Sequence, residues 1–180
     1  MKVKNYSNTL KDIKIAEGIF FEDLRGSLKK TMYSDLLIEY MGSISEVICT
    51  TSKFNVVRGL HYQSEPHQLK KFVTCVSGEI LDVFLDIRKD SPTFGQFGTI
   101  KLHSKDNYAV LIPEGFAHGY STLSKESIVV YLQSGNFEKD CDKSINPLSL
   151  NIDWLVEDPI VSEKDKNAAS FQSYKDNLNE

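Results

Sequence analysis

Two of the four histidines lie in short segments whose residue types suit proton transfer or ligand binding. His61 belongs to Val-Val-Arg-Gly-Leu-His-Tyr-Gln (56–63), which brings a guanidinium, an imidazole, a phenol and an amide together. His118 belongs to Pro-Glu-Gly-Phe-Ala-His-Gly-Tyr (113–120), where a proline and two glycines indicate a loop. Imidazole titrates near neutral pH, so both histidines are candidates for binding or catalysis. A hydrogen-bonded structural histidine is the alternative.

A metal site has to be considered because the spacing of Pro113, Gly115 and His118 is similar to the second motif of the cupins. Cupin metal sites usually also need a His-x-His pair with a glutamate a few residues later. His61 is instead followed by tyrosine and glutamine, and His67 comes six residues later. We therefore expect a cupin architecture without its metal ligands, and no cofactor.

The elements that must position these residues read mostly as short strands. Eight segments are rich in Ile, Val, Phe, Tyr and Thr, and Gly, Pro, Asn, Asp and Ser separate them. They are 14–21, 27–33, 43–51, 71–76, 79–87, 98–103, 108–112 and 127–132. Many short strands with close turns predict an all-β sandwich or barrel, and a double-sheet jelly roll with a few short helices is the favoured form.

Turns, caps and strand faces add detail to this pattern. Ser77-Gly78 indicates a tight hairpin between two strands. Asp82 and Asp86 are four residues apart, so they share one strand face. Ser34 is a candidate N-cap for a helix over 35–41, and Ser-Glu-Lys-Asp (162–165) is typical of the start of a short helix.

Length and composition limit the classes of protein to consider. The 180 residues suit one domain over 1–180, with a polar tail after about residue 165 that we expect to fray. A net charge of −4 argues against nucleic-acid binding, and the apolar runs are too short for a membrane helix or signal peptide. The sequence therefore predicts a cytoplasmic protein. Among the three cysteines, Cys49 and Cys75 lie in apolar runs and are expected in the core.

Several motifs in order resemble one enzyme family. They are Phe-x-Asp-x-Arg-Gly (21–26), Val-Arg-Gly-Leu-His-Tyr-Gln (57–63), Gly-Glu-x-x-Asp-Val-x-x-Asp-Ile-Arg (78–88), Ser-Pro-Thr-Phe-Gly (91–95), Pro-x-Gly-Phe-Ala-His-Gly (113–119), Ile-Asp-Trp (152–154) and Ser-Glu-Lys-Asp (162–165). Together they closely resemble the dTDP-4-dehydrorhamnose 3,5-epimerase family, over about residues 21–165. The resemblance implies a cupin-type double-stranded β-helix, metal-independent catalysis, and a homodimer with exchanged N-terminal strands. The implied substrate is a nucleotide-diphospho-4-keto sugar.

The resemblance also assigns catalytic roles. The hydrogens on C3 and C5 of a 4-keto sugar are acidic, and inversion needs a base on one face, an acid on the other and donors for the enolate. By resemblance His61 is the base, and Asp165 orients its ring. Tyr131 matches the proton donor across the sugar, and Lys71 matches the lysine near the enolate oxygen. From the residues alone, Tyr131 reads as a core aromatic and Asp165 as a helix-start residue.

The remaining family matches concern substrate binding. Arg25 and Arg58 resemble groups that bind the diphosphate, where a planar guanidinium suits paired phosphate oxygens. Gln63 and His118 are implied to line the pocket. Phe137 stands where the family often has a second tyrosine, and a phenyl ring cannot donate a proton. Upstream of Arg58, Phe54-Asn55 stands where a glycine is common.

These departures favour an epimerase acting mainly at C3 of a nucleotide-linked 4-keto-6-deoxy hexose or heptose, for surface polysaccharide or capsule synthesis. A full 3,5-epimerase of the dTDP-rhamnose pathway is the alternative. The related 3,4-ketoisomerases usually have Ala-His after the Arg-Gly-x-His motif, whereas Tyr62 and Gln63 follow His61 here. A sugar-nucleotide-binding cupin without activity is a further alternative. The sequence leaves the nucleotide open among dTDP, GDP, CDP and UDP.

Overall fold

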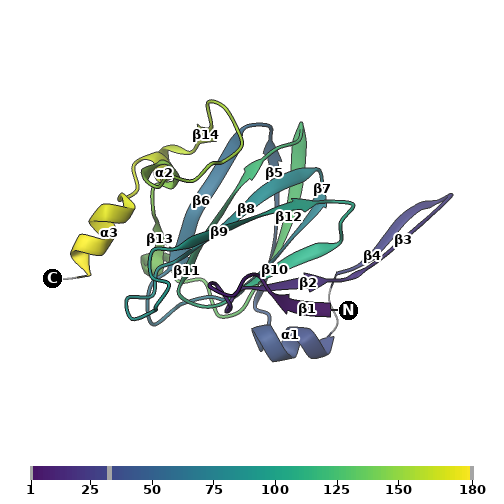
Figure 1. Ribbon diagram of the computed structural model, residues 1–180, viewed down its shortest axis with the longest axis horizontal. Coiled ribbons are helices and arrows are strands. Elements are labelled where there is room, and N and C mark those ends of the chain that lie inside the picture. The colour runs from purple at the N-terminus through teal and green to yellow at the C-terminus, as the bar shows by residue number, and fades with distance from the viewer. Residues whose placement is uncertain (1, 32–33, 179–180) are drawn as a thin grey trace.

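A computed structural model describes residues 2–31 and 34–178, which form two facing β-sheets with short helices outside them (Figure 1). The first sheet is antiparallel and has the strand order β1-β2-β10-β7-β12-β5. Its strands are β1 (Lys2–Asn5), β2 (Lys14–Glu17), β5 (Glu46–Lys53), β7 (Lys71–Ser77), β10 (Tyr108–Ile112) and β12 (Glu126–Gln133).

The second sheet has the order β13-β6-β11-β8-β9, and a short strand β14 pairs with β6 in parallel. Its strands are β6 (Val56–Gln63), β8 (Glu79–Asp86), β9 (Phe97–His103), β11 (Phe116–Thr122), β13 (Asp142–Ser144) and β14 (Ile160–Val161). From β5 to β8 and again from β10 to β12, consecutive strands alternate between the two sheets, as in a double-sheet jelly roll. The prediction of an all-β fold is confirmed.

Apolar side chains from both sheets fill the space between them. Val73 and Val110 of the first sheet pack in one cluster with Ile80, Phe84 and Leu102 of the second, and each is at most 2% exposed. Alternate residues of each strand point inward, so this interior is built from the period of two in the sequence. It forms the rigid support for the polar side chains described below.

Short helices cover the outer faces of the sheets. They are α1 (Ser34–Met41), α2 (Glu163–Lys166), α3 (Phe171–Asn177) and the 3-10 turns η1 (Lys139–Cys141) and η2 (Pro147–Ser149). Met41 of α1 packs on the outside of the first sheet, and Phe171 of α3 packs on the outside of the second. The tail was expected to fray, but α3 is docked, because Phe171 is buried and the Tyr174 hydroxyl donates to the Ile87 carbonyl at 3.0 Å.

A hairpin of β3 (Ile19–Asp23) and β4 (Gly26–Lys30) projects away from both sheets (Figure 1). The strand expected over 14–21 is split at Gly18, where β2 ends and the hairpin begins. Of the strand expected over 27–33, Met32 and Tyr33 lie outside the described residues. Apolar side chains on the hairpin face solvent, and none of the other described residues covers them.

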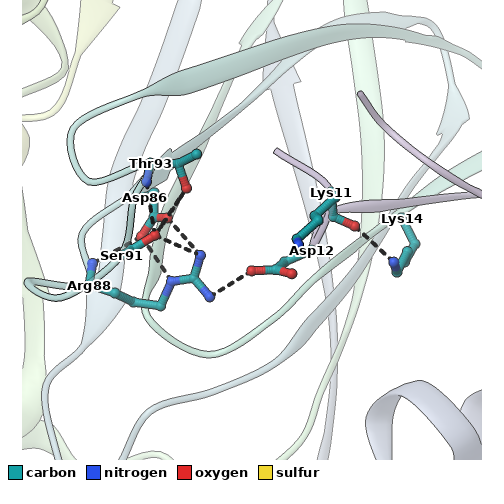
Figure 2. Close-up of polar contacts among 7 residues, drawn as sticks. All are labelled: Lys11, Asp12, Lys14, Asp86, Arg88, Ser91 and Thr93. Atoms are coloured by element: carbon teal, nitrogen blue, oxygen red, sulfur yellow. Dashed lines mark hydrogen bonds and ion pairs between the residues drawn. The ribbon is translucent and has the colours of Figure 1, made fainter. Parts of the chain in front are cut away.

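A buried carboxylate fastens the N-terminal segment to the end of β8 (Figure 2). Asp86 is fully buried and accepts hydrogen bonds from Arg88, Ser91 and Thr93, at 2.6 Å for both hydroxyls. Burial raises the pKa of Asp86, but these hydrogen bonds outweigh it and lower the pKa to about 2. Arg88 also donates to Asp12 at 2.9 Å, which ties the chain before β2 to this cluster.

The structure differs from the sequence-based expectation at His118 and at Ser77-Gly78. His118 lies in strand β11 rather than in a loop, because residues 116–122 pair with β8 on one side and β6 on the other. Ser77-Gly78 does not close a hairpin, because β7 belongs to the first sheet and β8 to the second. Gly78 has φ +76° and lies where a Cβ atom would meet the Glu126 carbonyl, so it turns the chain between the sheets.

The two cysteines expected in the core differ in burial. Cys75 is buried as expected, but Cys49 is exposed, because it points outward from β5, the edge strand of the first sheet. Asn55 has φ +65° and donates to the Glu157 carbonyl at 2.7 Å, so it serves the turn that a glycine commonly makes. None of the helices in the described ranges is long and apolar enough to cross a membrane.

Candidate active site

A cavity of about 240 Å³ lies between the sheets, and seven of the predicted site residues line it. Two come from the first sheet, four from the second and one from the loop after β12: Lys71 and Tyr131, then Arg58, His61, Gln63 and His118, then Phe137. Residues far apart in the sequence therefore meet because alternating strands bring both sheets to one interior.

His61 and Asp165 form a hydrogen-bonded pair at one wall of this cavity. The His61 Nε2 lies 2.7 Å from Asp165 Oδ1, and the side chains are 38% and 5% exposed. Burial raises the pKa of Asp165, but its hydrogen bond and charge interaction with His61 outweigh this and keep the pKa below its usual value. The ionised carboxylate accepts, so His61 Nε2 carries the proton and Nδ1 is left as the basic nitrogen.

The short helix α2 brings Asp165 to this position from outside the sheet. Its N-cap is Ser162, whose hydroxyl accepts from the Asp165 N–H at 3.1 Å, as the sequence predicted. Asn146 then holds the end of α2 by donating to the Lys166 carbonyl at 2.8 Å. The preceding residue, Ile145, exchanges two backbone hydrogen bonds with Leu60, next to His61. The helix is thereby fixed to β6, the strand that carries His61.

His118 and Asp82 form a second pair, which is entirely buried. The His118 Nε2 lies 2.7 Å from Asp82 Oδ1, and the side chains are 3% and 0% exposed. Burial lowers the pKa of His118; the carboxylate of Asp82 opposes this, and the nearby Lys71 and His61 add to it. The imidazole is therefore neutral at physiological pH and shapes the cavity floor.

Lys71 is buried between the two pairs. Its Nζ donates to the His61 carbonyl at 3.1 Å, and the side chain lines the cavity. Burial lowers the pKa of Lys71 to about 8, partly offset by the carboxylates of Asp142 and Asp82. An ammonium group with that pKa is mostly charged at pH 7 and can stabilise negative charge in the cavity.

Tyr131 reaches the cavity from the opposite sheet to His61. Its ring lies edge-on to the His118 ring, with 5.7 Å between centroids. Burial is the largest cause that raises the pKa of Tyr131 well above 10, and the neighbouring Tyr120 and Asp82 add to it. The phenol therefore keeps its proton at neutral pH and is able to donate it.

Arg58 is held at the cavity by the neighbouring first sheet. Its Nε donates to Ser52 Oγ at 2.8 Å, and its Nη2 donates to the Thr51 carbonyl at 3.3 Å. Ser52 also contacts the Tyr120 hydroxyl at 2.8 Å. The guanidinium is exposed, so its remaining N–H groups can bind an anion entering the cavity.

Arg25 is the one predicted binding residue far from the cavity of its own chain. It lies at the turn between β3 and β4, its side chain is 91% exposed, and it pairs with Asp23 at 2.7 Å. This pair holds the pKa of Asp23 below its usual value. A position on the projecting hairpin fits contact with another molecule.

Sequence reasoning missed the partner of His118. Asp82 interrupts the apolar segment Ile-Leu-Asp-Val-Phe-Leu (80–85), and an acidic residue in such a strand needs a polar partner. The sequence therefore contained a signal that Asp82 has a polar partner in the interior. Tyr120 was also missed: it is fully buried, and its hydroxyl also contacts Thr50 Oγ1 at 3.0 Å.

Of the residues weighed as metal ligands, His61 and His118 are register partners on β6 and β11 and line the cavity, but His67 does not join them. His67, considered beside His61 and His118, is exposed on the loop after β6. Across residues 2–31 and 34–178, no three His, Cys, Asp or Glu side chains are grouped closely enough to hold a metal ion.

The arrangement has the parts that inversion at an acidic carbon requires. An imidazole that can act as a base lies on the second sheet with a carboxylate of α2 bonded to it, and a protonated phenol lies on the first sheet. A buried cation lies beside the base. A carbon held between the sheets can lose a proton to one side and gain one from the other.

Comparison with known proteins gives the family of this chain. The family model of dTDP-4-dehydrorhamnose 3,5-epimerase matches residues 7–173. The dTDP-4-dehydrorhamnose 3,5-epimerase of Shigella flexneri is 39% identical over 165 residues, covering 89% of this chain and 91% of that protein. The dTDP-4-dehydrorhamnose 3-epimerase of Streptomyces niveus is 32% identical over 159 residues, covering 86% of this chain and 77% of that protein.

A solved structure gives the same answer for the fold. NovW, a 4-keto-6-deoxy sugar epimerase from the novobiocin biosynthetic gene cluster of Streptomyces spheroides, superposes with a TM-score of 0.92 at 28% identity. The alignment covers 99% of this chain and 91% of that one. The prediction of a cupin-type jelly roll is confirmed. The chain belongs to the dTDP-4-dehydrorhamnose 3,5-epimerase family and is a sugar-nucleotide epimerase.

Proposed function

We propose that this chain epimerises a nucleotide-linked 4-keto-6-deoxy sugar, a hexose or a heptose, mainly at C3, for surface polysaccharide or capsule synthesis. The relatives compared above are named for dTDP-4-dehydrorhamnose, so a dTDP sugar is the first substrate to test. The observation that carries the proposal is the placement of His61 and Tyr131 on opposite sheets of one cavity.

In the proposed step, His61 Nδ1 removes the proton from C3. The electron pair of the C–H bond moves to the oxygen on C4, and the ammonium group of Lys71 stabilises the enolate. Tyr131 then gives its phenolic proton to C3 from the opposite face, and the ketone re-forms. Exchange with solvent returns a proton to Tyr131 and removes one from His61. Arg58 binds the diphosphate and needs no metal ion to do so.

The preference for C3 rests on Phe137. Inversion at two carbons needs two reprotonations at different positions around the ring, and the phenyl group of Phe137 has no proton to give. The relative from Streptomyces niveus is named as a 3-epimerase, so the family includes enzymes with one inversion. Inversion of both carbons at equal rates is the alternative.

We further propose a homodimer in which the β3–β4 hairpin of each chain lies on its partner. Phe21, Leu24 and Leu28 on the hairpin are 58%, 108% and 53% exposed, and Val47 on the edge strand β5 is 67% exposed. Contact between these exposed apolar side chains would remove both surfaces from water, which favours association. Arg25 would then enter the partner's cavity and bind its diphosphate.

Mixing two variants tests this dimer. Arg25→Ala and His61→Asn homodimers should each be impaired, but a mixture should regain activity, because one site then has both residues. A fully active monomer by light scattering, or no recovery in the mixture, contradicts the shared site.

The reaction itself is tested in heavy water with 4-keto-6-deoxy sugar nucleotides. Reduction of the product followed by NMR identifies the deuterated carbons and their configurations. Deuterium with inversion at C3 is expected. Binding of the nucleotide without exchange at any carbon would instead identify a binding protein without activity.

A further inference from the structure

Gln63, the last residue of β6, was expected to line the pocket and does so, but its side chain is already engaged. It is 6% exposed, and its Nε2 donates to the His67 carbonyl at 2.6 Å and to the Asn136 carbonyl at 3.3 Å. Its Oε1 accepts from the Glu138 N–H at 2.7 Å. Both N–H groups and the oxygen of the amide are therefore bonded to backbone.

Two of these three backbone groups lie on either side of Phe137. Asn136 precedes it and Glu138 follows it, so the amide of Gln63 holds the loop at the position where Phe137 enters the cavity. The third group belongs to the loop after β6, so one side chain joins two loops. The phenyl ring is 53% exposed, so these contacts rather than burial fix its backbone.

The start of the same loop is fixed separately. The Ser134 N–H donates to the Lys70 carbonyl at 3.1 Å, and the Lys70 N–H donates to Ser134 Oγ at 3.1 Å. Gly135 follows with φ +76°, close to the Leu69 side chain, and Ser45 Oγ donates to its carbonyl. Contacts at Ser134 and Gly135 hold one end of the loop, so Gln63 controls the part that carries Phe137.

We infer that Gln63 is a positioning residue: it holds the Phe137 loop as a wall of the sugar pocket and does not bind the substrate itself. The kinetic part of this inference rests on the proposed epimerase function. Removing the amide leaves the Asn136 carbonyl and the Glu138 N–H without their partner, so the loop loosens. The sugar then loses a wall, whereas His61 and Tyr131 stay where their strands place them.

A double-mutant cycle separates this role from direct binding. Gln63→Ala and Phe137→Ala should each raise KM about 5- to 10-fold, the effect of losing roughly one hydrogen bond or one contact, with a smaller change in kcat. If Gln63 acts through Phe137, the double variant should have the KM of Phe137→Ala alone. If the two effects multiply, Gln63 contacts the substrate directly and the inference is overturned.

Amide hydrogen exchange gives a readout that does not depend on turnover. Residues 136–141 should exchange faster in Gln63→Ala than in the wild type, and Gln96→Ala, which changes an exposed glutamine before β9, should not alter them. Gln63→Glu keeps the acceptor for Glu138 and should exchange at an intermediate rate. Unchanged exchange in Gln63→Ala overturns the inference, whereas absence of epimerisation by the wild type counts against the proposed function alone.

Discussion

Two histidine–carboxylate pairs face the same cavity with the same spacing, but they differ in exposure. Nε2 and the carboxylate oxygen are 2.7 Å apart in both pairs. The His61 side chain is 38% exposed, whereas that of His118 is 3% exposed. A base must exchange its proton with substrate and solvent, so exposure and not the hydrogen bond distinguishes the pair proposed to be catalytic from the buried one.

The two pairs also differ in how the chain builds them. His118 and Asp82 lie on adjacent strands, β11 and β8, so the register of one sheet brings them together. Asp165 comes from α2, outside the sheet, and its contact with His61 depends on the contacts of Ser162 and Asn146. The geometry of the buried pair therefore depends on the sheet alone. The geometry of the exposed pair depends on the position of the short helix α2.

The largest expected effect separates the two histidines. His61→Asn should lower deuterium exchange at every acidic carbon by about 10²–10⁴-fold and leave nucleotide binding nearly unchanged, because the solvent-accessible base proposed for the cavity is lost. Exchange is measured in heavy water, and binding is measured by calorimetry with dTDP. Exchange at the wild-type rate in this variant would show that His61 is not the base and would make His118 the next candidate.

Lys71, between the pairs, has the next largest effect. Lys71→Met should lower enolisation by roughly 10²-fold, the usual effect of losing one donor to a developing oxyanion. Because the pKa of Lys71 is about 8 and the charged form is the active one, the wild-type rate should fall as pH rises above 8. The pH–rate profile checks this, and a flat profile from pH 7 to 9.5 contradicts the role.

Asp165→Asn should have an intermediate effect. The amide keeps the shape of the side chain but lacks the negative charge that orients the His61 ring and stabilises its protonated form. We therefore expect a rate about 10- to 100-fold lower. The variant should bind dTDP as the wild type does. A rate equal to that of the wild type would mean that the contact of this carboxylate with His61 is structural only.

Much of the fold could be predicted because the pattern is local. The strands expected over 71–76, 79–87, 98–103, 108–112 and 127–132 agree with the structure to within one residue at each end. The strand over 116–122 was read as a loop because glycines flank His118, yet Gly119 is needed there. A Cβ at Gly119 would lie 2.4 Å from the Arg58 carbonyl, so the glycine lets the neighbouring strand approach.

The catalytic roles proposed for Tyr131 and Asp165 could be suggested only through the family resemblance, since both residues have ordinary local explanations. The partner of His118 could not be named, because the register that brings Asp82 to it joins strands 36 residues apart in the sequence. The role inferred for Gln63 depends on three loop contacts that no spacing in the sequence encodes.

Acid should affect stability through the buried pair. The pKa of folded His118 is lowered by burial, so the unfolded chain binds this proton at a higher pH than the folded one. Stability should therefore fall as pH drops below about 6.5, by at most about 1.4 kcal/mol per pH unit from this group. His118→Gln keeps a donor for Asp82 but does not titrate. Urea unfolding at pH 7.5 and 5.5 should show a smaller loss in this variant.

The smallest effect concerns the second inversion. Phe137→Tyr restores a phenol at the cavity wall, and a positioned acid can reprotonate a carbon that Tyr131 does not reach. In the wild type, deuterium should enter C5 with retained configuration, because His61 returns it to the face from which the proton came. In Phe137→Tyr the ratio of C5 to C3 inversion should rise a few-fold, because one added hydrogen-bond donor changes a rate by about that factor. The configurations are assigned by NMR after reduction of the keto product.

Phe137→Leu, which restores no hydroxyl, is the control and should leave the ratio low. Equal inversion at both carbons in the wild type, or an unchanged ratio in Phe137→Tyr, would mean that the missing hydroxyl does not set the outcome.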